Sequence, residues 1–117
     1  MRGTVKHVKI RTDPGGMNKL ERAYADHLGI LQRIGEVTRW RFEPLKFKLG
    51  KACFYTPDFE VVAIDGTLEY HEVKGHWRDD ARVKIKAVAA LFRDRKFLAV
   101  TRPRKAWIVE VIDPPAG

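Results

Sequence analysis

The segment from Tyr55 to Lys74, YTPDFEVVAIDGTLEYHEVK, constrains the fold of this chain more than any other part of the sequence. It predicts two strands joined by a tight turn at Asp65-Gly66, because glycine tolerates the positive φ that a two-residue hairpin turn requires. Side chains alternate between the two faces of a strand, so Glu72 and Lys74 point to the same face. An antiparallel hairpin also returns Asp58 toward the end of the second strand. We therefore expect two carboxylates and one ammonium group to converge.

A helix is predicted before this hairpin, beginning near Met17 or Asn18 and ending near Arg33. An apolar stripe at helical spacing supports it, formed by Met17, Leu20, Tyr24, Leu28 and Leu31. Glu21 lies beside this stripe. On local sequence alone we favour a capping box, with Asn18 as the N-cap residue and Glu21 at the third helical position.

A second helix is predicted after the hairpin, from a cap at Asp79 or Asp80 to about Phe92. The residues expected to face the core are Val83, Ala87, Ala90 and Leu91. Further strands are predicted in 37–49, with a bend at Pro44, in 96–101 and in 106–112. This order predicts an α/β fold in which helices flank a mixed central sheet.

The composition is that of one globular domain spanning 1–117, with a possible basic N-terminal arm at 1–16 and a flexible tail at 113–117. Cys53 is the single cysteine, which excludes an internal disulfide and gives no zinc-binding spacing. No stretch has the apolar character of a signal peptide or of a membrane span. We expect a cytoplasmic protein.

The charge balance is the most informative part of the composition. Lys and Arg number 23 against 15 Asp and Glu, which gives a net charge of +8. A small basic domain favours polyanionic partners, because each phosphate that it neutralises releases counterions. A solvated basic surface is the alternative explanation, and charge by itself does not indicate catalysis.

Asp58, Glu72 and Lys74 are the residue types that metal-dependent phosphodiester hydrolysis requires. Two carboxylates can bind Mg²⁺ or Mn²⁺ through oxygen, and the backbone carbonyl of Val73 could add another oxygen ligand. Lys74 could orient the attacking water, stabilise charge on the phosphate or, if desolvated, assist as a base. A surface hairpin held by salt bridges is the alternative. Taken separately, the Glu-x-Lys and Pro-Asp patterns are weak evidence for such a site. Together, on the two strands of one hairpin, they are more specific.

YTPDF followed by HEVKG resembles the PD-(D/E)xK nuclease superfamily, and in particular the phage Holliday-junction resolving enzymes related to endonuclease I. The nuclease domain of a Tn7-type transposase subunit has a similar pattern. The resemblance implies a restriction-endonuclease-like fold and cleavage to 5′-phosphate and 3′-hydroxyl ends. It also implies that Asp58 and Glu72 are metal ligands, that Glu21 approaches the metal from the first helix, and that Lys74 is the catalytic lysine.

Several side chains outside this set are candidates for DNA binding. Each charged side chain, taken alone, is more simply explained as a solvated surface charge, and the tryptophan as an anchor to the core. As a set, they predict a rim of phosphate-binding residues around the site. The candidates are His76, Trp77, Lys84, Lys86, Arg102, Arg104 and Lys105.

These observations predict a Mg²⁺-dependent, structure-selective DNA endonuclease that resolves Holliday junctions in DNA recombination, encoded by a phage or prophage. Symmetric cutting of a four-way junction requires two active sites, so we expect a homodimer. One alternative is a nuclease of the same superfamily that acts on transposon ends, replication intermediates or duplex DNA. Another is a nucleic-acid-binding module without catalytic activity.

Overall fold

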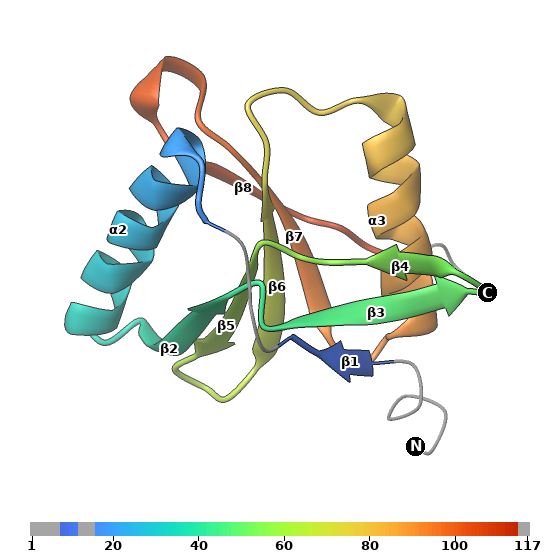
Figure 1. Ribbon diagram of the computed structural model, residues 1–117. Coiled ribbons are helices and arrows are strands. Elements are labelled where there is room, and N and C mark those ends of the chain that lie inside the picture. The colour runs from blue at the N-terminus through green and yellow to red at the C-terminus, as the bar shows by residue number, and fades with distance from the viewer. Residues whose placement is uncertain (1–7, 12–15, 115–117) are drawn as a thin grey trace.

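A five-stranded mixed sheet lies at the centre of the computed structural model, which describes residues 8–11 and 16–114 (Figure 1). The strand order is β2-β5-β6-β7-β8. β6 and β7 are parallel, and the other neighbouring strands in this sheet are antiparallel. The strands span Val37–Phe42 (β2), Phe59–Ala63 (β5), Leu68–Val73 (β6), Lys96–Thr101 (β7) and Ile108–Val111 (β8).

A smaller antiparallel sheet lies in front of the central one in Figure 1, in the order β1-β3-β4. Its strands are β1 (Val8–Ile10), β3 (Leu45–Gly50) and β4 (Cys53–Tyr55). The bend predicted at Pro44 is present. Pro44 has no N–H with which to continue the hydrogen bonds between strands, and Glu43 before it has φ of 43°. The chain therefore leaves the central sheet at this point and enters the small one. The sequence did not predict a second sheet.

The two helices cover opposite faces of the central sheet. Tyr24 and Leu28 of α2 (Lys19–Arg33) pack with Phe59 and Val61 on one face. On the other face, α3 (Asp79–Leu91) and the small sheet enclose a second cluster, in which the Phe47 ring contacts the rings of Tyr70, Phe92 and Phe97. A short 3-10 turn, η1 (Pro103–Lys105), joins β7 to β8. The predicted α/β architecture, a mixed sheet flanked by helices, is therefore confirmed.

The predicted inward face of α3 is wrong. The helix buries Ile85, Val88 and Ala89, whereas Val83 and Leu91 are 68% and 58% exposed. Apolar residues occur on several sides of this helix, so its sequence allows more than one stripe. Packing against the aromatic side chains of the sheet and of β3 selects the stripe that is buried.

The β5–β6 hairpin is present, but its turn is longer than the two residues predicted. β5 ends at Ala63 and β6 begins at Leu68. Gly66 has φ of 89°, as expected for glycine in such a turn, and Asp65 Oδ1 accepts a hydrogen bond of 2.9 Å from the N–H of Thr67. These contacts fix the register of the hairpin.

The predicted terminal segments lie partly outside the described residues. Within the predicted basic arm, 1–7 and 12–15 are outside them, and Val8–Ile10 forms β1, paired with β3. In the predicted tail, 115–117 are outside them. Neither helix in the described part of the chain combines the length and the apolar character needed to cross a membrane.

Candidate active site

Asp58 and Glu72 meet where β5 begins and β6 ends. Phe59 pairs with His71, and continuing this antiparallel register by one residue puts Asp58 opposite Glu72. Asp58 Oδ2 accepts a hydrogen bond of 2.8 Å from the N–H of Val73. Both carboxylate residues are buried, each with 7% of its surface exposed. The convergence expected from the hairpin is therefore present.

Lys74 and Tyr55 hold the two oxygens of Glu72. Lys74 Nζ lies 3.3 Å from Glu72 Oε2, and Tyr55 donates a hydrogen bond of 3.0 Å to Glu72 Oε1. Lys74 is partly exposed, whereas Tyr55 is buried in the core beside α3. Tyr55 belongs to β4 of the small sheet, so the site contains a contributor that strand alternation in the hairpin could not reveal.

Glu21 caps α2 and also lies near Asp58. The capping box is present: Glu21 Oε1 accepts from the N–H of Asn18 at 2.9 Å, and Asn18 Oδ1 accepts from the N–H of Glu21 at 2.8 Å. Glu21 also lies close enough to Asp58 to contribute to its raised pKa. The first turn of α2 thus brings a third carboxylate toward the pair.

Burial makes Asp58 and Glu72 reluctant to ionise. Burial, and next the charge of Glu72, raise the pKa of Asp58 to about 8; the hydrogen bond from Val73 opposes this shift, and Glu21 reinforces it. Burial also raises the pKa of Glu72, against the opposing effects of Lys74 and Tyr55. A cation placed between the two carboxylates would relieve this cost.

The donor set suits a hard divalent cation, which prefers carboxylate and carbonyl oxygens. Asp58 and Glu72 would be its ligands, with the Val73 carbonyl between Glu72 and Lys74 as a candidate third and Glu21 approaching from α2. Within the described ranges, no three His, Cys, Asp or Glu side chains are grouped so as to hold a metal as they stand. The two carboxylates of Asp58 and Glu72 are nevertheless ligands of the chemical type that Mg²⁺ and Mn²⁺ prefer.

We expect the metal-free protein to lose stability as the pH rises. The pKa of Asp58 is about 8 in the folded state against an ordinary value of 3.8, so between these values the folded state binds more protons than the unfolded state. The free energy of unfolding then falls with increasing pH across this range. Asp58→Asn removes the titrating group, so its Tm in chelator should exceed that of the wild type at pH 8 by roughly 5 °C or more, as expected for about 1 kcal/mol in a domain of this size.

Thermal unfolding at pH 4 and pH 8 checks this prediction. Asp65→Asn is the matched control, since Asp65 is exposed at the hairpin turn and has a lowered pKa. That control should show no gain in Tm at pH 8. Equal Tm values for wild type and Asp58→Asn at pH 8 would contradict the repulsion between the buried acids.

A pocket of about 210 Å³ opens beside Glu72 and Lys74. Lys84 of α3 and Trp77, from the loop before α3, contribute to its wall, so two of the predicted DNA-binding residues line the same pocket as Glu72. Trp77 packs against the core, and its indole N–H is buried without a hydrogen-bond partner. The lining residues are Tyr55, Thr56, Glu72, Lys74, Trp77, Ala81 and Lys84.

The remaining predicted DNA-binding residues do not line this pocket. His76 is exposed in the loop after β6, and Lys86 is exposed on the side of α3 that is near Glu110. Arg102 lies over the Trp107 ring, with its guanidinium carbon 4.6 Å from the ring centroid, and Arg104 and Lys105 are exposed in η1. Because β6 and β7 are parallel, this basic turn leaves the sheet at the same end as Lys74.

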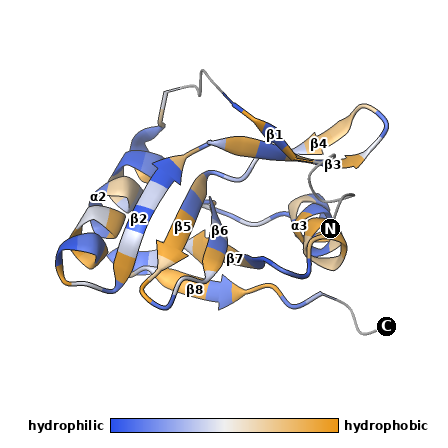
Figure 2. Ribbon diagram, turned by 90° about the horizontal axis from the view of Figure 1, so that it is seen from below, coloured by the Kyte–Doolittle hydropathy of each residue, from blue (hydrophilic) through white to orange (hydrophobic). Residues whose placement is uncertain are grey.

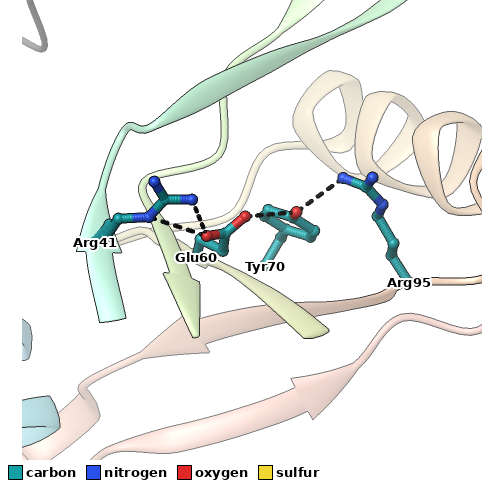
Figure 3. Close-up of polar contacts among 4 residues, drawn as sticks. All are labelled: Arg41, Glu60, Tyr70 and Arg95. Atoms are coloured by element: carbon teal, nitrogen blue, oxygen red, sulfur yellow. Dashed lines mark hydrogen bonds and ion pairs between the residues drawn. The ribbon is translucent and has the colours of Figure 1, made fainter. Parts of the chain in front are cut away.

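Figure 3 shows a polar network formed by Arg41, Glu60, Tyr70 and Arg95. Glu60 and Tyr70 are two residues from Asp58 and Glu72, respectively, along their strands, and so lie on the same face of the sheet. Glu60 and Tyr70 are paired across β5 and β6, and the Tyr70 hydroxyl donates to Glu60 Oε2 at 2.8 Å. Arg41 of β2 donates to Glu60 Oε1 from Nε and Nη2, and Arg95 donates to the Tyr70 oxygen at 2.9 Å. The network ties β2, β5 and β6 together two residues from Asp58 and Glu72, and sequence reasoning missed it.

The chain was compared with protein-family models, curated proteins and solved structures, and none of the three comparisons finds a match.

Proposed function

We propose that this protein is a metal-dependent DNA endonuclease of the PD-(D/E)xK type, with the corresponding restriction-endonuclease-like fold. The observation that carries the proposal is the convergence of Asp58, Glu72 and Lys74 at one end of a mixed sheet, with Glu21 approaching from a preceding helix. A hairpin stabilised only by surface salt bridges would leave its acids exposed. Here both are buried, and their ionised forms are disfavoured.

Each residue of the site has a distinct role in this proposal. A bound Mg²⁺ would polarise the scissile phosphate and favour ionisation of an attacking water. Asp58 and Glu72 hold the negative charge that attracts the cation, and the Val73 N–H fixes the orientation of Asp58. Lys74, positioned by Glu72 at the wall of the pocket, directs its ammonium group toward a phosphate oxygen or the attacking water.

The surroundings of the site suit a nucleic acid backbone. Lys84 lines the pocket and is available as a hydrogen-bond donor to phosphate oxygens. Arg102, Arg104 and Lys105 extend the basic surface at the same end of the sheet. Contacts of this kind recognise the charged backbone of DNA more than its base sequence.

The proposed substrate is a four-way DNA junction and the proposed active species is a homodimer, acting in the cytoplasm of a host cell during phage recombination. The support for this finer part of the proposal is the resemblance of YTPDF and HEVKG to the endonuclease I-type resolving enzymes, together with the net charge of +8. The two strand cuts of a resolution event require two sites related by symmetry.

A cleavage assay on three DNA substrates tests both parts of the proposal. The protein is incubated with a four-way junction, a linear duplex and a single strand, in Mg²⁺ or in chelator. We expect cleavage in Mg²⁺ only, with the junction cut at least about tenfold faster than the duplex, which corresponds to a difference of about 1.4 kcal/mol in activation free energy. Absence of metal-dependent cleavage of every substrate would refute the nuclease, and equal rates on junction and duplex would refute the junction preference.

A further inference from the structure

β8 is an open edge of the central sheet, and the two edges of this sheet differ. β2, at the other edge, has a register irregularity between Val37 and Arg39 and carries Arg39 and Arg41. Bulges and charged side chains are the usual means by which edge strands are protected from pairing with another chain. β8 pairs with β7 in an unbroken register and, of its four residues, only Glu110 is charged.

The exposed side chains of β8 are apolar and β-branched. Ile108, Val109 and Val111 are 52%, 45% and 44% exposed. In Figure 2, β8 runs along the lower border of the sheet, and no other described element lies beyond it. These side chains have high strand propensity, so the edge is suited to accept a further strand.

We propose that β8 pairs with β8 of a second copy of this chain, so that two central sheets join into one continuous sheet. The local charge favours a second copy over a nucleic acid at this edge: 106–113 (AWIVEVID) contains two acids and no Lys or Arg, in a chain with 23 basic residues. Glu110 is paired with Arg82 of α3, so its charge is balanced, and Asp113 adds no positive charge. Self-association of a protein of net charge +8 is least opposed where the surface has little net positive charge.

The backbone indicates the register of this pairing. The N–H of Ile112 donates to the carbonyl of Phe97 in β7, so the alternate residues Val109 and Val111 direct their N–H and C=O groups away from β7. If the two copies of β8 pair antiparallel with Val109 on the two-fold axis, the free N–H and C=O groups of each copy hydrogen-bond to those of the other. This register places Trp107 opposite Val111 of the partner subunit.

This inference assigns a surface to the homodimer that the proposed function requires, and in that sense it rests on the proposed function. In such a dimer, β6 and its counterpart would be separated by five strand spacings, about 24 Å across the sheet at about 4.8 Å each. The two carboxylate pairs would lie on the same face of the joined sheet, at opposite ends of their strands.

Sedimentation velocity without DNA or metal tests the interface independently of cleavage. The wild type should form dimers, and Val109→Lys, which opposes two ammonium groups at the axis, should weaken the dimer at least about tenfold, or about 1.4 kcal/mol. Thr38→Lys is the matched control, since it adds the same charge to an exposed position on the β2 edge and should leave dimerisation unchanged. A monomeric wild type, or equal effects of the two substitutions, would overturn the proposal.

A cross-linking measurement tests the register of this pairing. In a Cys53→Ser background, which removes the exposed native thiol, Val109→Cys should give an oxidised dimer linked across the axis. Failure of the cross-link to form would overturn the β8 pairing. Cleavage is measured separately. A monomer that still cuts DNA would therefore refute the β8 interface without refuting the proposed nuclease activity.

Discussion

Asp58→Asn is expected to abolish metal-dependent cleavage of DNA while leaving the protein folded and able to bind DNA. Asparagine keeps the shape of the side chain and an oxygen that can accept the hydrogen bond from Val73, but it removes the charge that holds the cation. Loss of a residue that supports a metal ligand typically costs 10–100-fold, so loss of a ligand itself should reduce the cleavage rate by more than about 100-fold. DNA binding should be equal or tighter, because one negative charge is removed near the phosphates.

The experiment compares cleavage and binding of the same labelled junction by the wild type, Asp58→Asn and Asp65→Asn. The second variant carries the identical chemical change at the exposed hairpin turn, where the Thr67 N–H rather than a metal is the partner. It should cleave at the rate of the wild type. Retention of activity by Asp58→Asn would show that the metal site has been assigned to the wrong residue.

Glu60→Ala is expected to destabilise the protein strongly while leaving the proposed metal ligands intact. The carboxylate is buried and is bound by Arg41 and by the hydroxyl of Tyr70, which is itself fully buried (Figure 3). Removing one partner of a buried ion pair costs 3–5 kcal/mol. Arg41 is half-exposed and can return to water, so we expect a smaller loss, about 2–3 kcal/mol in the free energy of unfolding.

Urea unfolding of Glu60→Ala beside Tyr70→Phe measures this contribution. Tyr70→Phe removes only the hydroxyl and should cost about 1–1.5 kcal/mol. The two losses should not sum in the double variant, because the substitutions share one hydrogen bond. If Glu60→Ala unfolds at the same urea concentration as the wild type, the network contributes nothing to stability and the buried carboxylate has another role.

The features of this protein that depend on local sequence patterns could be predicted from the sequence. The period of two in β6 and the antiparallel return of the hairpin were sufficient to bring Asp58, Glu72 and Lys74 together. The capping signal at Asn18 and Glu21 gave the start of α2 to within a residue. Each of these features depends on neighbours in the sequence or on one tight turn.

The parts that depend on distant packing were not predictable in the same way. The sequence predicted the bend at Pro44. The direction of the chain after the bend depends on packing in the aromatic cluster around Phe47, which the sequence does not reveal. For that reason the small sheet was missed, and with it the contact of Tyr55 with Glu72. The buried stripe of α3 was wrong because the helix carries apolar residues on more than one side, and only the sheet decides between them.

The antiparallel hairpin has a consequence for the order in which the chain folds. Local pairings close faster than distant ones, because little chain entropy is lost in closing a short loop. The β5–β6 hairpin is local, whereas the pairing of β2 with β5 must wait for the excursion through β3 and β4. We therefore expect Asp58 and Glu72 to meet at an early, still hydrated stage of folding, when water screens their repulsion. The full electrostatic cost should then arise later, when β4 and α3 close over the pair.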